Sequence, residues 1–563
     1  MSQPQQGSTQ TSMVIVALTF LSAFLISLIF TPVIRNWALD KHIVDSPGSR
    51  KVHVENIPRL GGVAILCGFL IPLLLFVEIT PALRGLIVGS LIIFATGLID
   101  DIYHLKPKTK FLGQGLACLI VIILGKFYIV NLGNIFGSGP ITLPFWATLP
   151  FTIFAVIGVS NAINLIDGLD GLAGGVSAIA LAAFVLISFQ TGNPFVLGVS
   201  ASLLGSVIGF LKHNLYPARI FMGDGGSLFC GFVLAILAIS LTQQGADPVA
   251  PILPLVVLGV PIIDTLWVMT RRLRHGTNPF IADRTHLHHK FLDLGFQHRF
   301  TVVIIYSFSW LWAGVVIALT TFPDYLFFYG YLAFTLLLYL GLRYILNHKD
   351  TFTWTSRDSM AGIRDSVTFN RLIGLSSGLL PMITLFLAVY PLAAILLQGD
   401  CCTTLQPVFI IFFCVLTFAF LPTFQSHKGL RLTLTYLAIL LIIYVIRTDG
   451  AQLGPIGDHP AYRVADIVLL IGLTLTAINV FLHSQWEHFL TSMDSLLIGT
   501  SLLMAIFFLH QPGYNHLPGV LLRGMVYYHG LKVLGIKEKS GLSVVVSAIL
   551  LTLLVVAVKP FLT

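Results

Sequence analysis

The chain has 563 residues, of which 56% are hydrophobic and only 10% charged, and its mean hydropathy is +0.90. A soluble globular protein carries about 25% charged residues, so this composition excludes an ordinary soluble enzyme, and its apolar content excludes a disordered chain. A polytopic membrane protein remains. The formal net charge of +8 leaves nucleic acid, anionic lipid and an anionic substrate open as partners, and only the placement of the charges can decide among them.

Apolar segments of about 20 residues, the length that crosses the hydrocarbon core, recur along the chain. They predict an all-α polytopic membrane protein in three parts: about eleven spans (1–346), a cytoplasmic linker (347–371) and about six further transmembrane helices of unknown function (372–563). The expected spans lie near 13–34, 61–79, 83–100, 112–132, 144–165, 172–190, 195–213, 226–242, 250–270, 300–322, 325–346, 372–398, 405–424, 430–447, 464–483, 493–510 and 543–562.

Lysine and arginine orient the chain. In the first half, one set of alternate loops holds sixteen of these residues, whereas the opposite loops hold only Arg84 and Lys126. Because cytoplasmic loops carry the excess of positive charge, the N-terminus is expected outside and the basic loops in the cytoplasm.

Carboxylates are also concentrated at the ends of spans and in the loops expected in the cytoplasm. The need to orient the chain in the membrane does not explain them, because acidic residues contribute little to topology. A charge at the bilayer centre costs at least about 2.5–3.5 kcal/mol, so such groups belong at an interface or in a polar cavity. Acidic residues among many basic ones predict a site that handles a metal and an anion together. The residues are Asp100, Asp101, Asp167, Asp170, Asp224, Asp264 and Asp283.

The segment 97–111, GLIDDIYHLKPKTKF, ends an apolar span in two adjacent carboxylates, Asp100 and Asp101. Pro107 then breaks the chain among three lysines. Adjacent residues of a helix point in different directions, so the two carboxylates are expected to have separate roles. A solvated helix end could carry the same pair, so this segment alone leaves both interpretations open.

The segment 161–175, NAINLIDGLDGLAGG, follows another span with amides and carboxylates. Asn164, Asp167 and Asp170 are spaced three apart, so they share one face if the helix continues through them. The glycines permit close approach of a ligand or a neighbouring helix. A purely structural polar cluster is the weaker interpretation, because polar side chains at the end of an apolar span are costly to pack.

The segment 214–227, NLYPARIFMGDGGS, places Asp224 between two glycines just before the next span. A carboxylate there can hold a cation beside backbone N–H groups that bind phosphate. The alternative is a helix N-cap, a role in which Asp is common, and the two roles are compatible.

Three imidazoles, His286, His288 and His289, lie in the basic segment 271–296, RRLRHGTNPFIADRTHLHHKFLDLGF. A zinc site needs three or four convergent ligands, and no matching Cys pair or second His pair occurs nearby. Binding of an anion is favoured, because Arg and His donate hydrogen bonds to phosphate oxygens. A basic, proline-broken loop at 45–62, DSPGSRKVHVENIPRLGG, is suited to close over such a ligand. With oxygen ligands and phosphates on one face, Mg²⁺ is the expected metal.

Together and in this order, the five segments resemble the polyprenyl-phosphate N-acetylhexosamine-1-phosphate transferases, over about residues 13–346. The related MraY branch typically carries P-T-M-G-G where this chain has Pro58-Arg59-Leu60-Gly61-Gly62. It also carries three consecutive histidines where this chain has His286-Leu287-His288-His289. Both departures favour the WecA/TagO-like branch and an N-acetylated amino sugar.

The resemblance implies transfer of an N-acetylhexosamine 1-phosphate, above all GlcNAc-1-phosphate, from a UDP-sugar to undecaprenyl or another polyprenyl phosphate. UMP is released, and the reaction starts the synthesis of a cell-envelope glycan such as a wall polymer or lipopolysaccharide. The implied cofactor is Mg²⁺, with Mn²⁺ as an alternative. The implied partners are the UDP-sugar, polyprenyl phosphate and the lipid bilayer of a bacterial-type inner (plasma) membrane, without nucleic acid. A homodimer is one option for the assembly.

The family's roles can be carried onto the matching positions of this chain. They imply Asp224 and Asn164 as metal ligands, and Asp100, Asp101, His286, His288 and His289 as catalytic residues. The implied substrate-binding residues are Arg50, His53, Arg59, Lys110, Asp167, Asp170 and Asn214.

Residues 372–563 match no motif, and a different class, a transporter or lipid flippase, is the main alternative for the whole chain. Transporters place ionisable groups and broken helices near the midplane, often in repeated halves. Here the acidic residues gather at one face and the two halves share no motif, so the transferase is favoured for the first half.

Overall fold

The computed structural model describes residues 3–45, 57–245, 248–276, 285–320, 322–348, 491–509 and 549. Of the predicted site residues, Arg50 and His53 lie outside this part of the chain. Residues 349–371 of the predicted linker 347–371 and most expected spans of the second half also lie outside it. The chain divides into two compact units, and the unit that contains the remaining site residues comprises Met1–Trp354 and Ser492–Leu503. The predicted domain boundaries at 346 and 371 stay predictions.

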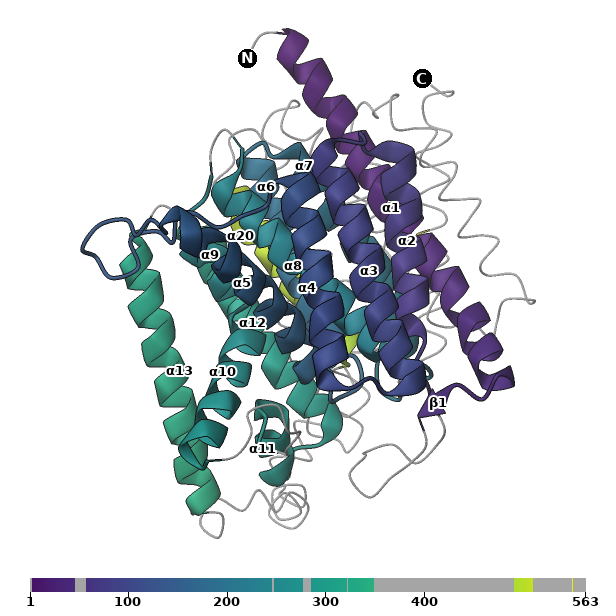
Figure 1. Ribbon diagram of the computed structural model, residues 1–563, viewed down its shortest axis with the longest axis vertical. Coiled ribbons are helices and arrows are strands. Elements are labelled where there is room, and N and C mark those ends of the chain that lie inside the picture. Colours follow the sequence, from purple (N-terminus) through teal and green to yellow (C-terminus); the bar gives the residue numbers. More distant parts are fainter. Residues whose placement is uncertain are drawn as a thin grey trace. The chain divides into compact units, whose positions relative to one another are not determined.

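The described residues are almost entirely helical (Figure 1). Within them, nine helices are long and apolar enough to cross a membrane. They are α1 (Gln3–Asp40), α3 (Pro81–Tyr103), α4 (Pro107–Gly125), α5 (Phe145–Ile166), α6 (Leu172–Gln190), α7 (Pro194–Asn214), α8 (Gly223–Gln243), α12 (His298–Ala318) and α13 (Asp324–Asn347). The shorter elements are α2 (Gly61–Phe76), α9 (Ile252–Val257), α10 (Gly259–Arg274), α11 (Leu287–Asp293), α20 (Ser492–Leu509) and the antiparallel pair β1 (Val44–Asp45) and β2 (Ile57–Pro58).

Local signals in the sequence explain several of the helix boundaries. Thr80 caps α3 by accepting a hydrogen bond from the backbone N–H of Leu83, and Asn193 caps α7 in the same way. The break predicted at Pro107 is confirmed: α3 ends at Tyr103, His104 takes a left-handed conformation, and α4 begins at Pro107. The all-α prediction is therefore confirmed for the described residues.

The prediction of one continuous span over 250–270 is wrong. The segment is divided into α9 and α10, and Leu258 between them has a ψ of 9°. Gly259 and Pro261 follow at once, and Pro261 has no N–H to donate to the carbonyl of Val257. The break gives α10 its own direction (Figure 1). This helix contains Asp264 and three arginines near its end.

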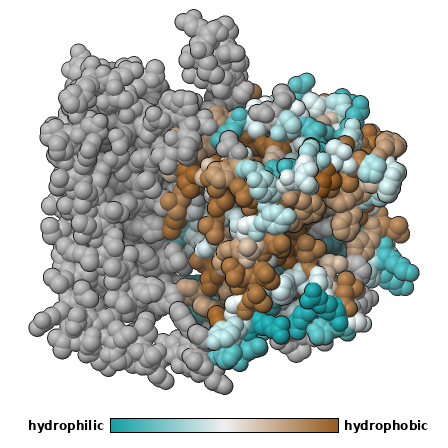
Figure 2. All heavy atoms as spheres, turned by 90° about the vertical axis from the view of Figure 1, so that its left-hand side faces the viewer, coloured by the Kyte–Doolittle hydropathy of each residue, from teal (hydrophilic) through white to brown (hydrophobic). Residues whose placement is uncertain are grey.

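The two most enclosed membrane helices are α6 and α8. For each, 89% of the most apolar window is buried, against 22% for α1 and for α13. Peripheral helices such as α13 instead expose apolar side chains, among them Leu332, Leu336 and Leu337. Figure 2 shows such apolar residues over the middle of one face, with hydrophilic residues gathered at its lower end. This distribution suits a helix bundle surrounded by lipid.

The first turn of α8 is held between α2 and α3 by contacts of glycine with glycine. A Cβ at Gly62 of α2 would lie 2.6 Å from the Cα of Gly226, and a Cβ at Gly97 of α3 would lie 2.6 Å from the Cα of Gly225. Because no side chain separates the three backbones, the start of α8 lies directly against both neighbours. This contact places Asp224 beside the end of α3.

Candidate active site

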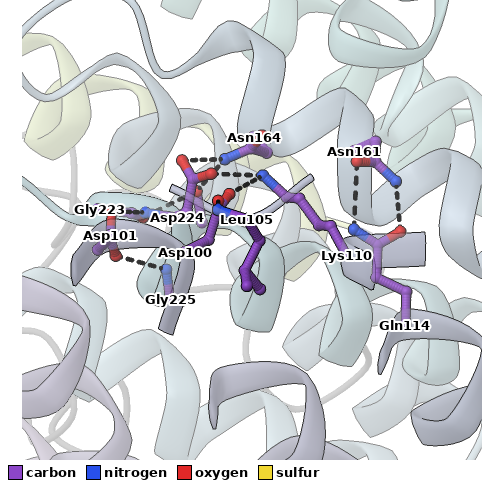
Figure 3. Close-up of polar contacts among 11 residues, drawn as sticks. Asp100, Asp101, Leu105, Lys110, Gln114, Asn161, Asn164, Gly223, Asp224 and Gly225 are labelled. Atoms are coloured by element: carbon purple, nitrogen blue, oxygen red, sulfur yellow. Dashed lines mark hydrogen bonds and ion pairs between the residues drawn. The ribbon is translucent and has the colours of Figure 1, made fainter. Parts of the chain in front are cut away.

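Asp224 lies at the centre of a polar cluster formed where α3, α4, α5 and α8 meet (Figure 3). Its Oδ1 accepts a hydrogen bond of 3.0 Å from Nδ2 of Asn164, and its Oδ2 pairs with Nζ of Lys110. The side chain is 35% exposed, so the carboxylate can be reached from outside the protein while its orientation is fixed. The prediction that the segments 97–111, 161–175 and 214–227 form one site is consistent with this geometry.

Lys110 joins two carboxylates from different helices. Its Nζ lies 2.9 Å from Oδ2 of Asp100 and also contacts Oδ2 of Asp224. The second oxygen of Asp100 accepts a hydrogen bond of 2.7 Å from the backbone N–H of Leu105, which fixes the carboxylate in the last turn of α3. Lys110 and Asp100 are only 18% and 14% exposed, so the ion pair is largely removed from water.

Asp101 has a different set of contacts from its neighbour, as the sequence predicted. Its two oxygens accept hydrogen bonds from the backbone N–H groups of Asp224 (2.9 Å) and Gly225 (3.0 Å). The side chain of Asp101 therefore satisfies two of the free N–H groups at the start of α8, across a contact between helices. In this arrangement Asp101 positions Asp224, and the N-cap role proposed for Asp224 belongs to Asp101.

Asn164 supports Asp224 through its amide nitrogen. Nδ2 donates both to Asp224 and, at 2.8 Å, to Oγ of Ser227. One turn away, Asn161 and Gln114 exchange hydrogen bonds of 2.8 and 3.3 Å between α5 and α4 (Figure 3). This amide pair fixes the two helices that carry Asn164 and Lys110.

The predicted common face of Asn164, Asp167 and Asp170 required one continuous helix. The helix α5 ends at Ile166, so only Asn164 lies on it. Residues 167–171 instead form a tight loop in which Gly171 has a φ of +78°, a conformation that favours glycine. Asp170 accepts a hydrogen bond of 2.9 Å from the N–H of Ala218.

The buried Asn214 ties this loop to the segment before α8. It accepts a hydrogen bond from the N–H of Gly171 and donates one to the carbonyl of Ile220. Both ends of its amide are thus engaged within the protein, and Asn214 fixes the backbone of the site.

Asp167 faces the cluster of carboxylates. Its pKa is raised to about 7, first by burial and then by the charges of Asp224, Asp101 and Asp170, while the charge of Arg59 lowers it. The Asp167 carboxylate can therefore exchange a proton near neutral pH.

This shift predicts a pH-dependent effect of Asp167→Asn on stability. The unfolded chain loses the proton near pH 3.8 and the folded protein near pH 7, so folding loses stability as the pH rises through that window. Removing the ionisable group should raise the melting temperature in detergent without divalent metal, and the gain should be larger at pH 8 than at pH 5. An equal gain at the two pH values would contradict this account.

The three predicted histidines have different environments. His286 and His288 are 5% and 2% exposed, and only His289 is half-buried. Burial lowers the pKa of His288 to about 3, aided by His289, so its ring is neutral. The ring lies directly against the backbone of Gly168, beside Asp167. The predicted segment 271–296 therefore meets the segment 161–175, and His289 is the most exposed of the three imidazoles.

The contact with Gly168 predicts the effect of Gly168→Ala. The added methyl group would overlap the His288 ring, so we expect the histidines to be displaced and the catalytic rate to fall about tenfold or more. Gly158→Ala on α5 is a matched control, because its Cβ would meet nothing within 4 Å. Initial rates and thermal unfolding of both variants test this, and equal rates would contradict it.

A further residue, Asp264 on α10, was noted in the sequence only as one of seven acidic residues. The structure buries it to 2% exposure and joins it to His286 with a distance of 2.8 Å between Oδ2 and Nδ1. A signal in the sequence existed, because an Asp within an apolar segment requires a partner, but nothing indicated which partner.

Comparisons with known proteins give one matching family and several relatives. The sequence profile of "Glycosyl transferase family 4" matches residues 83–242. The "Probable undecaprenyl-phosphate N-acetylglucosaminyl 1-phosphate transferase" of Bacillus subtilis strain 168 is 34% identical over 312 residues, which is 54% of this chain and 86% of that protein. The "Decaprenyl-phosphate N-acetylglucosaminephosphotransferase" of Mycolicibacterium smegmatis is 35% identical over 53% of this chain and 80% of its own length. The "Undecaprenyl-phosphate alpha-N-acetylglucosaminyl 1-phosphate transferase" of Salmonella typhi is 30% identical over 52% and 81%.

The helical fold and the charged cluster at the ends of its helices define a membrane-embedded enzyme with a polar site. The chain belongs to glycosyl transferase family 4, and the resemblance to polyprenyl-phosphate sugar-1-phosphate transferases is confirmed.

Proposed function

We propose that this protein transfers GlcNAc 1-phosphate from UDP-GlcNAc to a polyprenyl phosphate and releases UMP. The observation that carries the proposal is the Asp100–Lys110–Asp224 cluster, a fixed and partly exposed set of charges at the ends of apolar helices. The names of the relatives from three bacterial species support the choice of sugar and lipid.

The chemical problem is to bring two anions together. The lipid phosphate must approach the phosphorus that bears the sugar, so cationic groups are needed to offset the repulsion and the charge that develops on the phosphoryl oxygens. Lys110 and Arg59 provide fixed positive charge beside the carboxylates. In our proposal, the lipid phosphate oxygen forms the new bond to this phosphorus while the bond to the oxygen of UMP breaks.

The residues present fit a magnesium ion. Mg²⁺ takes one or two carboxylates and keeps waters or substrate phosphates as its other ligands. Asp224 offers a partly exposed carboxylate, with Asp167 facing the same cluster, and Asn164 orients Asp224 through its amide nitrogen. Within the described residues no group of three or more His, Cys, Asp and Glu side chains could hold a metal, so the proposed site relies on one or two carboxylates together with substrate phosphates or waters. When bound, Mg²⁺ would supply charge neutralisation between the two phosphates.

The orientation completes the proposal. With the N-terminus outside, the site lies at the cytoplasmic face of a bacterial-type inner membrane, where a soluble nucleotide sugar can reach it. The product would be a lipid-linked sugar diphosphate that begins a cell-envelope glycan.

The direct experiment supplies the full chain in lipid vesicles with polyprenyl phosphate, Mg²⁺ and a panel of UDP-sugars. We expect UMP and a lipid-linked GlcNAc diphosphate, with UDP-GlcNAc preferred over UDP-GalNAc and no UMP when the lipid is omitted. A transporter would move lipid or sugar without forming UMP, and that result would overturn the proposal.

A further inference from the structure

Asp264 on α10 accepts three hydrogen bonds, two from the start of α11 and one from α13. Its Oδ1 accepts from the backbone N–H of Leu287 and from the hydroxyl of Tyr339, both at 2.8 Å, and its Oδ2 lies 2.8 Å from Nδ1 of His286. The carboxylate thus connects α10, the start of α11 and α13. A buried carboxylate is expensive unless it is bonded in this way, so the contacts are expected to persist.

These contacts fix the state of His286. Since an ionised carboxylate only accepts hydrogen bonds, Nδ1 of His286 must carry a proton. The other ring nitrogen, Nε2, is then the atom that can accept a hydrogen bond. Within the described residues, Nε2 of His286 has no hydrogen-bond partner.

Tyr339 is itself held firmly. It is 3% exposed, its ring stacks on that of Trp267 at 4.3 Å between centroids, and Nζ of Lys290 lies 4.1 Å from its centre. Trp267 belongs to α10 and Lys290 to α11, so the same three elements are joined a second time. The arrangement leaves α11 little freedom to move relative to α10 and α13.

The position of α11 matters for the candidate active site. His288, two residues after His286, lies against Gly168 beside Asp167. The stacked rings of His286 and His288 have centroids 5.8 Å apart and an interplanar angle of 9°. Whatever fixes His286 therefore also fixes the imidazoles next to the carboxylate cluster.

We propose that Asp264, held by Tyr339, is a positioning residue that sets the tautomer and place of His286, so that its Nε2 accepts a hydrogen bond from a hydroxyl or amide N–H group of the nucleotide sugar. The inference rests on the proposed transferase function and adds to it a residue that acts through another. Asp264 does not touch the substrate in this account.

A double-mutant cycle tests the proposal in the full chain. His286→Gln and Asp264→Asn should each lower kcat about 10- to 100-fold, with a smaller change in KM for the lipid. The slowing of the double variant should be much smaller than the product of the two single effects, because Asp264 acts mainly through His286. Multiplicative effects of the two substitutions, or an unchanged kcat in Asp264→Asn, would overturn the inference.

Tyrosine variants provide a second test if Asp264→Asn fails to fold. Tyr339→Phe removes one of the three donors and should lower kcat about two- to fivefold. Tyr331→Phe is the matched control, since Tyr331 lies two turns earlier on α13 and packs its ring on Trp312. Equal rates in the two variants would contradict the role of Tyr339.

A readout that does not depend on catalysis separates this inference from the proposed function. Imidazole ¹⁵N spectra of the labelled wild type should show His286 as the Nδ1–H tautomer, with its signal assigned from His286→Gln. That signal should change in Asp264→Asn and remain in Tyr331→Phe. If the wild type forms no UMP but the spectra behave as described, the transferase proposal fails while the contact of Asp264 with His286 is supported. If the spectrum of Asp264→Asn is unchanged, the proposed role of Asp264 is contradicted.

Discussion

Asp224→Asn should lower UMP release about 10³-fold or more while leaving the protein inserted and folded. The side chain keeps its size and one oxygen, so Asn164 or Lys110 can still bond to it. The backbone N–H groups at the start of α8 remain capped by Asp101. The substitution removes the negative charge that would bind a divalent cation and that holds Lys110 in place. Electrostatic groups of this kind contribute most of the rate enhancement in phosphoryl transfer.

Initial rates of UMP release, together with melting temperatures in detergent, measure this effect. Asp40→Asn is the matched control, because Asp40 lies exposed at the end of α1 and its loss of charge should leave the rate unchanged. Near-normal UMP release by Asp224→Asn would refute the assignment of this carboxylate.

Lys110→Met should lower the rate about 10²-fold or more. Methionine has a similar length and no charge, so the substitution removes the ammonium that Asp100 and Asp224 share without opening a large cavity. The two carboxylates would then lose their common partner, and the incoming phosphate would lose a fixed cation.

Lys108→Met on the same helix provides the comparison, since Lys108 is exposed. Lys110→Arg should restore part of the activity because it returns the charge with a different shape. A rate for Lys110→Met above half of the wild-type rate, at equal protein in the membrane, would contradict the role given to this residue.

Much of the fold was predictable from the sequence, because apolar length and proline placement act locally. The break at Pro107 and the capping of α3 and α7 follow from residues within one turn of each boundary. The division of 250–270 into α9 and α10 was missed because its overall hydropathy suits a span, although Gly259 and Pro261 marked the position.

Candidate residues for the site could be named from the sequence, whereas their contacts could not. Patterns in the sequence identified Asp100, Asp101 and Asp224 as functional candidates. Their partners lie far along the chain: 123 residues separate Asp101 from the N–H of Asp224, and 114 separate Lys110 from Asp224. Such pairs depend on how helices pack, which the glycine contacts of α2, α3 and α8 decide.

The same limit applies to Asp264. Its partner Tyr339 lies 75 residues away on α13, and no periodic pattern links the two positions. The only local indication that Asp264 had a role was its position within an apolar segment, where an ionisable side chain needs a partner.

The measurement that tests the central claim most directly follows the phosphorus. UDP-GlcNAc labelled with ³²P in its β-phosphate is supplied to the full chain in vesicles that contain polyprenyl phosphate and Mg²⁺. If the protein transfers a sugar 1-phosphate, the label enters the lipid and the released nucleotide is unlabelled UMP. Label released as UDP would show that only the sugar is transferred, and label that stays entirely in UDP-GlcNAc would show that no transfer takes place; either result contradicts the account.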